Sequence, residues 1–242
     1  MKLYLPEVTL VMIDGTCPDL ARLALQDSMA QVDCAEVLVC SPQDLDVAGT
    51  RWIKAPDWTD RLGPSAFIWY ELPKLMRTGW VLLISWDAWV IDATCWSNQF
   101  LEYDYVGAPW WYNDGYNVGH GLLRSRRLLQ FLADNRDRFP LGHPEDDLLS
   151  RHYRPALEQH GLHWAPERIA ARFMFECTRP SPFSRHFMFH DSFNFPLVLE
   201  GERLAERARL MRENSYLKKG TKIAELESGR RPFILPRLAA PV

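Results

Sequence analysis

The sequence contains three short runs of apolar residues that do not alternate with polar ones. They are VTLVMI at 8–13, EVLVC at 36–40 and WVLLIS at 80–85. Strands with a continuously apolar sequence are typical of parallel sheets, which are buried on both faces. A helix that begins near Pro18 fits between the first two runs, because proline is favoured in a first helical turn and the apolar residues after it keep to one helical face. Strand, helix and strand with short connections predict a βαβ unit and an α/β fold.

The rest of the chain continues this alternation less regularly. The patterns predict helices at 63–78, 94–104, 125–135 and 144–161 and a short strand at 104–110. Pro73 either kinks the first of these helices or lies near its start, and Pro155 splits the last one. An aromatic, irregular segment follows, and then a charged helix and a proline-rich end. We therefore predict a single α/β domain over 1–199, a mixed sheet flanked by helices, with a C-terminal tail over 200–242.

Composition and charge argue against several classes of protein. Acidic and basic residues nearly balance, 31 against 28, so no overall positive field marks a nucleic-acid-binding protein. The five cysteines form no CxxC pair, which argues against a zinc ribbon or a disulfide framework. Pro6 and Glu7 interrupt the apolar N-terminus, and no run approaches the roughly 18 apolar residues of a membrane span. These features predict a soluble, cytoplasmic protein.

Two acidic residues follow predicted strands, at the carboxyl ends where ligands bind in open α/β sheets. Asp14 follows the first run in an Asp-Gly turn, and Asp87 stands among tryptophans two residues after the third run. An ionised carboxylate in apolar surroundings needs a counter-charge, hydrogen-bond donors or a metal ion. Asp87 is thus a candidate ligand for a metal or a cation, although a helix cap near Ala93 or an arginine partner would also satisfy it. Asp14 also fits an ordinary turn.

Six short motifs occur in an informative order. They are IDG, SWDAWVI, FLEYDYVGAPWW, VGHGLLRSRRLL, PEDDLL and FMFHDS, spread over residues 6–195. In this order they resemble a family of largely uncharacterised bacterial and phage proteins, which is similar to the GT-A class of nucleotide-sugar glycosyltransferases. The resemblance implies a GT-A-like fold and an enzyme that transfers a sugar from a nucleoside-diphosphate donor, such as a UDP-sugar, to a hydroxyl acceptor. The acceptor would be a glycan or a modified DNA base.

The resemblance also implies a donor site and a metal site. Asp87 takes the place of the last acid of the DxD motif, which holds Mn²⁺ or Mg²⁺ against the diphosphate, and His190 resembles the C-terminal histidine that completes the metal site. Ser85 stands where the first acid of that motif is expected, which predicts weak metal binding or none. The glycine-rich turn is shorter than usual and has His120 in place of asparagine. The implied donor-binding residues are Asp14, Gly15, Ser85, Trp86, Asp87, Gly119, His120, Gly121 and Arg124.

Acids at the start of the helix predicted at 144–161 are candidates for catalysis. Glu145 and Asp146 resemble the acidic motif that supplies the general base in inverting GT-A enzymes, and we expect Asp146 to accept the proton of the acceptor hydroxyl. Acids in a first helical turn also act as caps without any catalysis. Trp110 and Trp111 are candidates for a wall on which the acceptor stacks, although core packing is the commoner role of tryptophan.

Two other functions fit the same residues. Ser85 and the shortened glycine turn also fit a non-catalytic module that binds a glycan or a nucleotide on a degenerate GT-A fold. A nucleotidyltransferase is a weaker alternative, because DGTCPDLAR at 14–22 lacks a phosphate loop rich in glycine, arginine and lysine. The nucleotide base, the sugar and the oligomeric state do not follow from the sequence.

Overall fold

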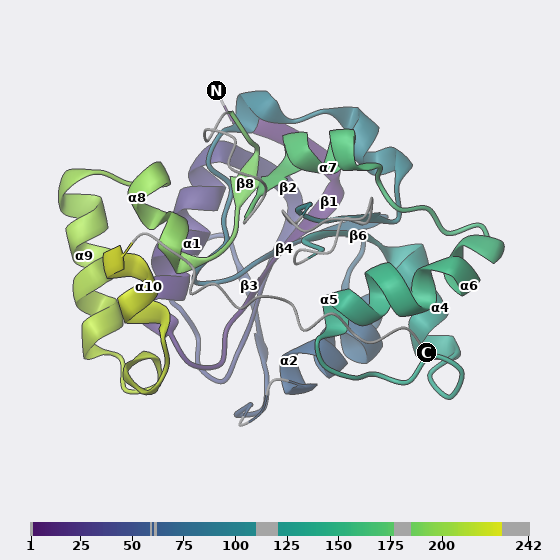
Figure 1. Cartoon of the computed structure of the whole chain (residues 1–242), viewed down its shortest axis with the longest axis horizontal. Coiled ribbons are helices and arrows are strands. Elements are labelled where there is room, and N and C mark those ends of the chain that lie inside the picture. Colours follow the sequence, from purple (N-terminus) through teal and green to yellow (C-terminus); the bar gives the residue numbers. More distant parts are fainter. Residues whose placement is uncertain (1, 59, 61, 110–120, 177–184, 229–242) are drawn as a thin grey trace. The chain divides into compact units, whose positions relative to one another are not determined.

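The computed structural model describes the whole chain except residues 1, 59, 61, 110–120, 177–184 and 229–242. Contacts between Cα atoms divide the chain into two compact units, Met1–Asp191 and Ser192–Val242. The boundary predicted from the sequence, between residues 199 and 200, lies inside the second of these units. Figure 1 shows the helices and strands of both units.

The first unit contains a six-stranded sheet (Figure 1). Its strands are β1 (Leu3–Ile13), β2 (Val32–Ser41), β3 (Arg51–Lys54), β4 (Trp80–Ile84), β5 (Tyr105–Val106) and β6 (Leu123–Ser125). In space they follow the order β3-β2-β1-β4-β6-β5. The first four strands are parallel, whereas β6 runs antiparallel to both β4 and β5. The predicted fold class, a mixed sheet flanked by helices, is confirmed.

The apolar runs form the centre of this sheet. Leu10 in the middle of β1 is fully buried and pairs with Val37 on one side and Leu82 on the other. β1 and β2 begin earlier than predicted, because the more polar residues at their starts also pair in parallel, for example Tyr4 with Asp33. An apolar run therefore predicted only the part of each strand that is buried on both faces of the sheet.

Helices connect these strands. As predicted, α1 (Pro18–Gln31) joins β1 to β2 and has proline in its first turn. The helix predicted at 63–78 is divided into α2 (Leu62–Ala66), a π-helical turn (Phe67–Glu71) and α3 (Leu72–Leu75). The helix predicted at 144–161 is divided in the same way into α5 (Glu145–Asp147), a π-helical turn (Leu148–Tyr153) and α6 (Arg154–Gln159). Pro73 and Pro155 lie in the first turns of α3 and α6, where the missing N–H is tolerated.

The helix predicted at 125–135 is confirmed as α4 (Arg126–Asp134), which is capped where the Ser125 hydroxyl accepts a hydrogen bond from the Leu128 amide. The strand predicted at 104–110 pairs only over β5. A Gly-Ala-Pro sequence follows β5, and proline cannot donate to a ladder. The cluster of buried side chains around Trp69, Tyr105 and Trp164 fills the space between α4, α6 and the turn at 67–71.

A second, two-stranded parallel sheet lies in the segment that the sequence presented as irregular. It consists of β7 (Met174–Phe175), directly after α7 (Glu167–Phe173), and β8 (Met188–Phe189). The chain after β4 pairs with β8: Val90 forms an antiparallel bridge with Met188, and the Ile91 amide donates to the Phe187 carbonyl at 2.9 Å. The end of β4 is thereby held beside the end of β8.

The short helix expected after Ala93 consists of two 3-10 turns, Ala93–Cys95 and Asn98–Glu102. The side chain of Asp92 accepts from the Thr94 amide and caps the first of them. The possibility that Asp87 caps this helix is therefore wrong, because Asp92 is the acid one residue before it.

The second unit is helical. It contains a 3-10 turn (Ser192–Asn194), α8 (Phe195–Val198), α9 (Gly201–Glu213), another 3-10 turn (Leu217–Lys219) and α10 (Lys222–Ser228). The predicted charged helix is α9, whose buried side includes Arg207, Ala208 and Met211. Among the residues that the structure describes, no helix is long and apolar enough to cross a membrane.

Candidate active site

Asp87 lies in a tight turn at the carboxyl end of β4. Ser85 and Ala88 exchange backbone hydrogen bonds of 2.9 and 3.1 Å across this turn. The Asp87 carboxylate is only 7 % exposed and accepts a hydrogen bond from the Ser85 hydroxyl at 2.8 Å. The serine in the place of the motif's first acid therefore contacts the acid that remains.

His190 is brought to the same place by β8. The Asp191 amide donates to the Asp87 carbonyl at 2.9 Å, and His190 Nε2 lies 4.0 Å from Asp87 Oδ2. The other ring nitrogen of His190, Nδ1, lies 2.7 Å from Glu176 Oε1. Asp191 adopts a left-handed backbone with φ of 84°, which is uncommon for a residue other than glycine and tends to occur at functional sites.

The charges around His190 favour its protonated form. Burial alone lowers the pKa of His190, but the neighbouring carboxylates of Glu176, Asp87 and Asp191 more than offset this, and the pKa is raised to about 9. His190, Glu176 and Asp87 thus form a buried network of charged groups.

Asp14 follows β1, beside the end of β4 in the parallel sheet. Its two carboxylate oxygens each lie 3.0 Å from the Cys17 amide, so the side chain holds the turn that leads into α1. Burial raises the pKa of Asp14 to about 6, and the charge of Asp87 contributes to the same shift, while the amides of Cys17 and Thr16 oppose it. Asp14 therefore serves the turn and also lies within electrostatic reach of Asp87.

Glu145, at the start of α5, is held by a buried arginine. Arg124 Nη1 and Nη2 donate to the two oxygens of Glu145 at 2.5 and 3.1 Å, and the indole N–H of Trp69 donates to Oε1 at 2.5 Å. Arg124 is 1 % exposed and also donates from Nε to the Gly121 carbonyl at 2.6 Å. This bidentate pair is strong and directional, so it determines where α5 begins relative to β6.

Asp146, the next residue, has a different environment. Its carboxylate is 9 % exposed and accepts a hydrogen bond from the Asp147 amide at 3.0 Å. Burial raises the pKa of Asp146 to about 7, with further contributions from the negative charges of Glu145 and Glu176, while the Asp147 amide and His190 oppose the shift. Asp146 thus interacts with the charges of the His190 network, and a carboxyl with this pKa exchanges a proton readily near neutral pH.

A sequence comparison identifies the family of the chain. The model of a family described as "Protein of unknown function (DUF5672)" matches residues 51–186, more than half of the sequence. The chain belongs to this family. The DUF5672 match includes Asp87, Arg124, Glu145 and Asp146, whereas Asp14 and His190 lie outside it. No curated protein matches the sequence.

Solved structures show what the fold resembles. A crystal structure of the galactosyltransferase LgtC in complex with donor and acceptor sugar analogues is 12 % identical, with a TM-score of 0.51, and the match covers 86 % of this chain and 96 % of that one. An active-site mutant of LgtC matches over the same shares of the two chains at 12 % identity, with a TM-score of 0.50. The apo form of the glycosyltransferase GlyE from Streptococcus pneumoniae TIGR4 is 13 % identical, covers 76 % of this chain and 54 % of that one, and has a TM-score of 0.47.

The LgtC matches show the fold alone, at this low identity. This DUF5672 protein has the fold of GT-A glycosyltransferases, and the predicted resemblance of an uncharacterised family to that class is confirmed. The roles predicted for individual residues do not follow from the fold, because one fold supports many functions.

The structure brings several of the predicted residues together. Asp14, Ser85, Asp87 and His190 lie at the ends of β1, β4 and β8, and Asp146 interacts electrostatically with His190. Gly15 and Trp86 follow in the same turns, and a Cβ on Gly15 would lie 3.0 Å from the Trp58 ring. Trp110, Trp111, Gly119 and His120 lie outside the described residues, so their roles stay predictions.

Packing requires a glycine at position 121, which the sequence did not suggest. A Cβ at this position would lie 2.0 Å from the ring of the fully buried Tyr105, so only glycine fits. Arg124, one of the implied donor-binding residues, forms a buried ion pair with Glu145 of the acidic motif. Donor binding by Gly121 and Arg124 remains a prediction.

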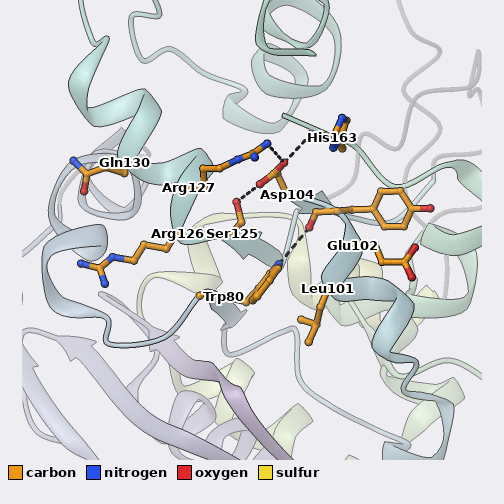
Figure 2. A pocket seen from close by; sticks show the side chains of 11 residues that line it. Trp80, Leu101, Glu102, Asp104, Ser125, Arg126, Arg127, Gln130 and His163 are labelled. Carbon is orange, nitrogen blue, oxygen red and sulfur yellow. Dashed lines mark hydrogen bonds and ion pairs between the residues drawn. The ribbon is translucent and has the colours of Figure 1, made fainter. Parts of the chain in front are cut away.

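A surface cavity of about 610 Å³ lies elsewhere, at the start of β4 (Figure 2). Its lining includes Trp80, the first residue of β4, together with Asp104 and Arg127, and contains none of the residues predicted for the site. As Figure 2 shows, its polar side chains bind one another: Asp104 accepts from the Ser125 hydroxyl at 2.5 Å, Arg127 at 3.1 Å and the His163 amide at 2.8 Å. Because ligands of α/β sheets bind at the carboxyl ends of strands, we place the candidate site at Asp87.

Glu176, Asp191 and Trp69 are described residues of the site that the sequence reasoning missed. Trp69 carries no local signal, since its partner Glu145 is 76 residues away. Glu176 does carry one: the tripeptide Phe-Met-Phe precedes both Glu176 and His190, at 173–175 and 187–189.

Proposed function

We propose that the protein is a glycosyltransferase that moves a sugar from a nucleoside diphosphate to a hydroxyl acceptor, with inversion at the anomeric carbon. One observation carries the proposal: Asp87, His190 and Asp146 belong to one electrostatic network at the carboxyl ends of strands in a GT-A fold. The protonated His190 offers a positive charge to a diphosphate, and Asp146 offers a carboxyl that accepts a proton near neutral pH.

Asp146 is the general base of this proposal. The acceptor hydroxyl attacks the anomeric carbon from the face opposite the diphosphate and forms a new C–O bond, while the bond between that carbon and the phosphate oxygen breaks. The hydroxyl proton passes to the Asp146 carboxylate, and the nucleoside diphosphate leaves with the electron pair of the broken bond. Glu145 is the poorer candidate because Arg124 and Trp69 already donate to both of its oxygens.

A divalent cation fits this site in part. Asp87 Oδ2 and His190 Nε2 are an oxygen and a nitrogen donor 4.0 Å apart, and they would hold Mn²⁺ or Mg²⁺ between them. In the described part of the chain, no group of three or more histidine, cysteine or acidic residues could hold a metal, so diphosphate oxygens and water would complete the coordination. The ion would supply positive charge to the leaving diphosphate. Because the ion must displace a proton from His190, we expect weak binding.

For the acceptor, we propose only the reacting group, which is a hydroxyl. Asp146 requires a hydroxyl that can reach it, and a glycan provides one. No observation on the described residues favours a modified DNA base over a glycan. Trp110 and Trp111, the predicted acceptor wall, lie outside the described residues, so their contribution stays a proposal.

A non-catalytic module that binds nucleotides is the second candidate. The observation in its favour is the hydrogen bond of 2.8 Å that the Ser85 hydroxyl donates to Asp87. The motif has a second acid at the position of Ser85, and here a neutral hydroxyl contacts Asp87 instead. Such a module would bind a nucleoside diphosphate without catalysing transfer or hydrolysis.

Titration calorimetry with UDP and the other nucleoside diphosphates, with and without Mn²⁺, tests both candidates. We expect binding of one of them, and a loss of affinity of about 10- to 100-fold in Asp87→Asn, the usual range for a lost charged interaction. Asp104→Asn is the matched control, because Asp104 is also a buried acid but lies beside the start of β4. Absence of binding to every nucleoside diphosphate would exclude both candidates. Binding without hydrolysis or transfer of any nucleotide sugar would leave the module.

A further inference from the structure

Two identical tripeptides precede Glu176 and His190. Phe-Met-Phe occurs at 173–175 and again at 187–189, and the two copies pair in parallel, Met174 with Met188 and Phe175 with Phe189. Glu176 and His190 therefore occupy the next position of the same register. The His190 amide donates to the Phe175 carbonyl at 2.9 Å, which continues the ladder to this position.

The pairing brings the two side chains into contact. Glu176 is 2 % exposed, and its Oε1 lies 2.7 Å from Nδ1 of His190. An ionised carboxylate only accepts hydrogen bonds, so the hydrogen must be on Nδ1 of the ring. The opposite nitrogen, Nε2, then faces Asp87 Oδ2 across 4.0 Å. The contact with Glu176 thus determines both the rotation of the ring and the nitrogen that faces the proposed donor site.

We propose that Glu176 is a positioning residue for His190, which it holds with Nδ1 protonated and Nε2 directed at Asp87 and the diphosphate of the donor. This inference rests on the proposed function for the diphosphate, but the orientation of the ring does not. A carboxylate that fixes the far nitrogen of a histidine is a common way to orient a ring toward a metal ion or an anion.

A neighbouring histidine has a backbone partner instead of an acid. His186 is as buried as His190, and its Nδ1 lies 2.8 Å from the carbonyl oxygen of Ala171, so a backbone group holds this buried imidazole in the same sheet region. Burying a carboxylate for this purpose carries a desolvation cost that a carbonyl does not. The carboxylate of Glu176 adds negative charge beside His190, the histidine that faces Asp87 among the described residues.

Two variants separate hydrogen bonding from charge. Glu176→Gln keeps an oxygen that accepts from Nδ1, whereas Glu176→Leu has a similar volume and no acceptor. We expect Glu176→Leu to lose affinity for UDP with Mg²⁺ by about 10- to 100-fold, the usual effect of removing such a partner, and Glu176→Gln to lose less than that. Asp104→Asn is the control, a buried acid outside the site that should bind UDP like the natural protein.

Nitrogen-15 NMR of the imidazole rings reports the protonated nitrogen of His190 directly in the natural protein. In the natural protein we expect His190 to be protonated at Nδ1, with and without UDP and Mg²⁺. In Glu176→Leu we expect the Nδ1 signal to show that the hydrogen bond to residue 176 is lost. A His190 ring protonated at Nε2 alone would overturn the inference, and so would UDP affinity in a folded Glu176→Leu that equals that of the natural protein.

The two proposals fail separately. If the natural protein binds no nucleoside diphosphate while the NMR signal shows protonated Nδ1 held by Glu176, the proposed function fails and the positioning of His190 stands. If UDP binds and the ring pattern is reversed, the inference about Glu176 fails and the proposed function stands.

Discussion

Buried acids have different surroundings at the two ends of β4. At its start, Asp104 accepts hydrogen bonds from Ser125, Arg127 and the His163 amide, so one acid has three donors. At its carboxyl end, Asp14 lies within electrostatic reach of Asp87, and Asp146 lies within reach of Glu176. His190 interacts with Asp87, Glu176 and Asp146. Burial raises the pKa of Asp14 and Asp146 there.

This difference separates a structural site from a candidate functional one. Acids that are satisfied by several donors stabilise the fold, whereas buried acids with raised pKa values cost stability when they ionise and are retained where chemistry needs them. The cavity of about 610 Å³ lies at the structural end, so we use the arrangement of charge, rather than the presence of a cavity, to locate the candidate site.

Asp146→Asn should have the largest effect on catalysis. Removing a general base costs about 100- to 10,000-fold in rate, whereas the affinity for the nucleoside diphosphate should stay near that of the natural protein. Initial rates of sugar transfer or donor hydrolysis, measured beside calorimetry, check this. Equal losses of rate in Asp146→Asn and in Asp104→Asn would contradict the distinction between the two ends.

Arg124→Leu should have the largest effect on stability. It leaves Glu145 buried without its main counter-charge, which costs about 3–5 kcal/mol in the free energy of unfolding. Denaturation by urea measures this free energy. The double variant with Glu145→Leu should recover most of the loss, because the charge left behind is removed as well. A double variant no more stable than Arg124→Leu would contradict the account.

The rate should also depend on pH in a defined direction. The pKa of Asp146 is raised by burial to about 7, so below pH 7 the carboxyl is protonated and cannot accept a proton. We expect kcat/KM to rise about tenfold for each pH unit up to about 7 and to level off above it. A rate that falls as pH rises from 5 to 7 would exclude Asp146 as the general base.

Arg127→Leu should have the smallest effect. The Arg127 side chain is 60 % exposed where it pairs with Asp104, and exposed ion pairs contribute about 0–1 kcal/mol. Urea denaturation and donor binding should both stay close to those of the natural protein. A loss as large as that of Arg124→Leu would show that the start of β4 is as sensitive to charge as its carboxyl end.

Much of the site was predictable from strand ends. Asp14 and Asp87 follow apolar runs, and the parallel pairing of those runs places both acids at one edge. Glu176 was not predicted, because β7 and β8 are each two residues long and their repeated Phe-Met-Phe did not stand out against other aromatic sequence. The different environments of Glu145 and Asp146 were not predictable either, because two adjacent acids at the start of a helix cannot be distinguished until their contacts are known.

The sequence by itself determined the α/β class and the sheet centre, because continuously apolar runs are stable only where both faces are buried. It also predicted that Pro155 divides one helix and that Pro73 kinks another or lies near its start, and the structure places both prolines in first helical turns. Tertiary structure alone decided that Arg124 and Trp69 hold Glu145, and that Asp87 and Glu176 meet at His190. These contacts join residues that are 14 to 103 positions apart (176 to 190, 87 to 190), and only the packed sheet brings such side chains together and removes the water that would weaken their charges.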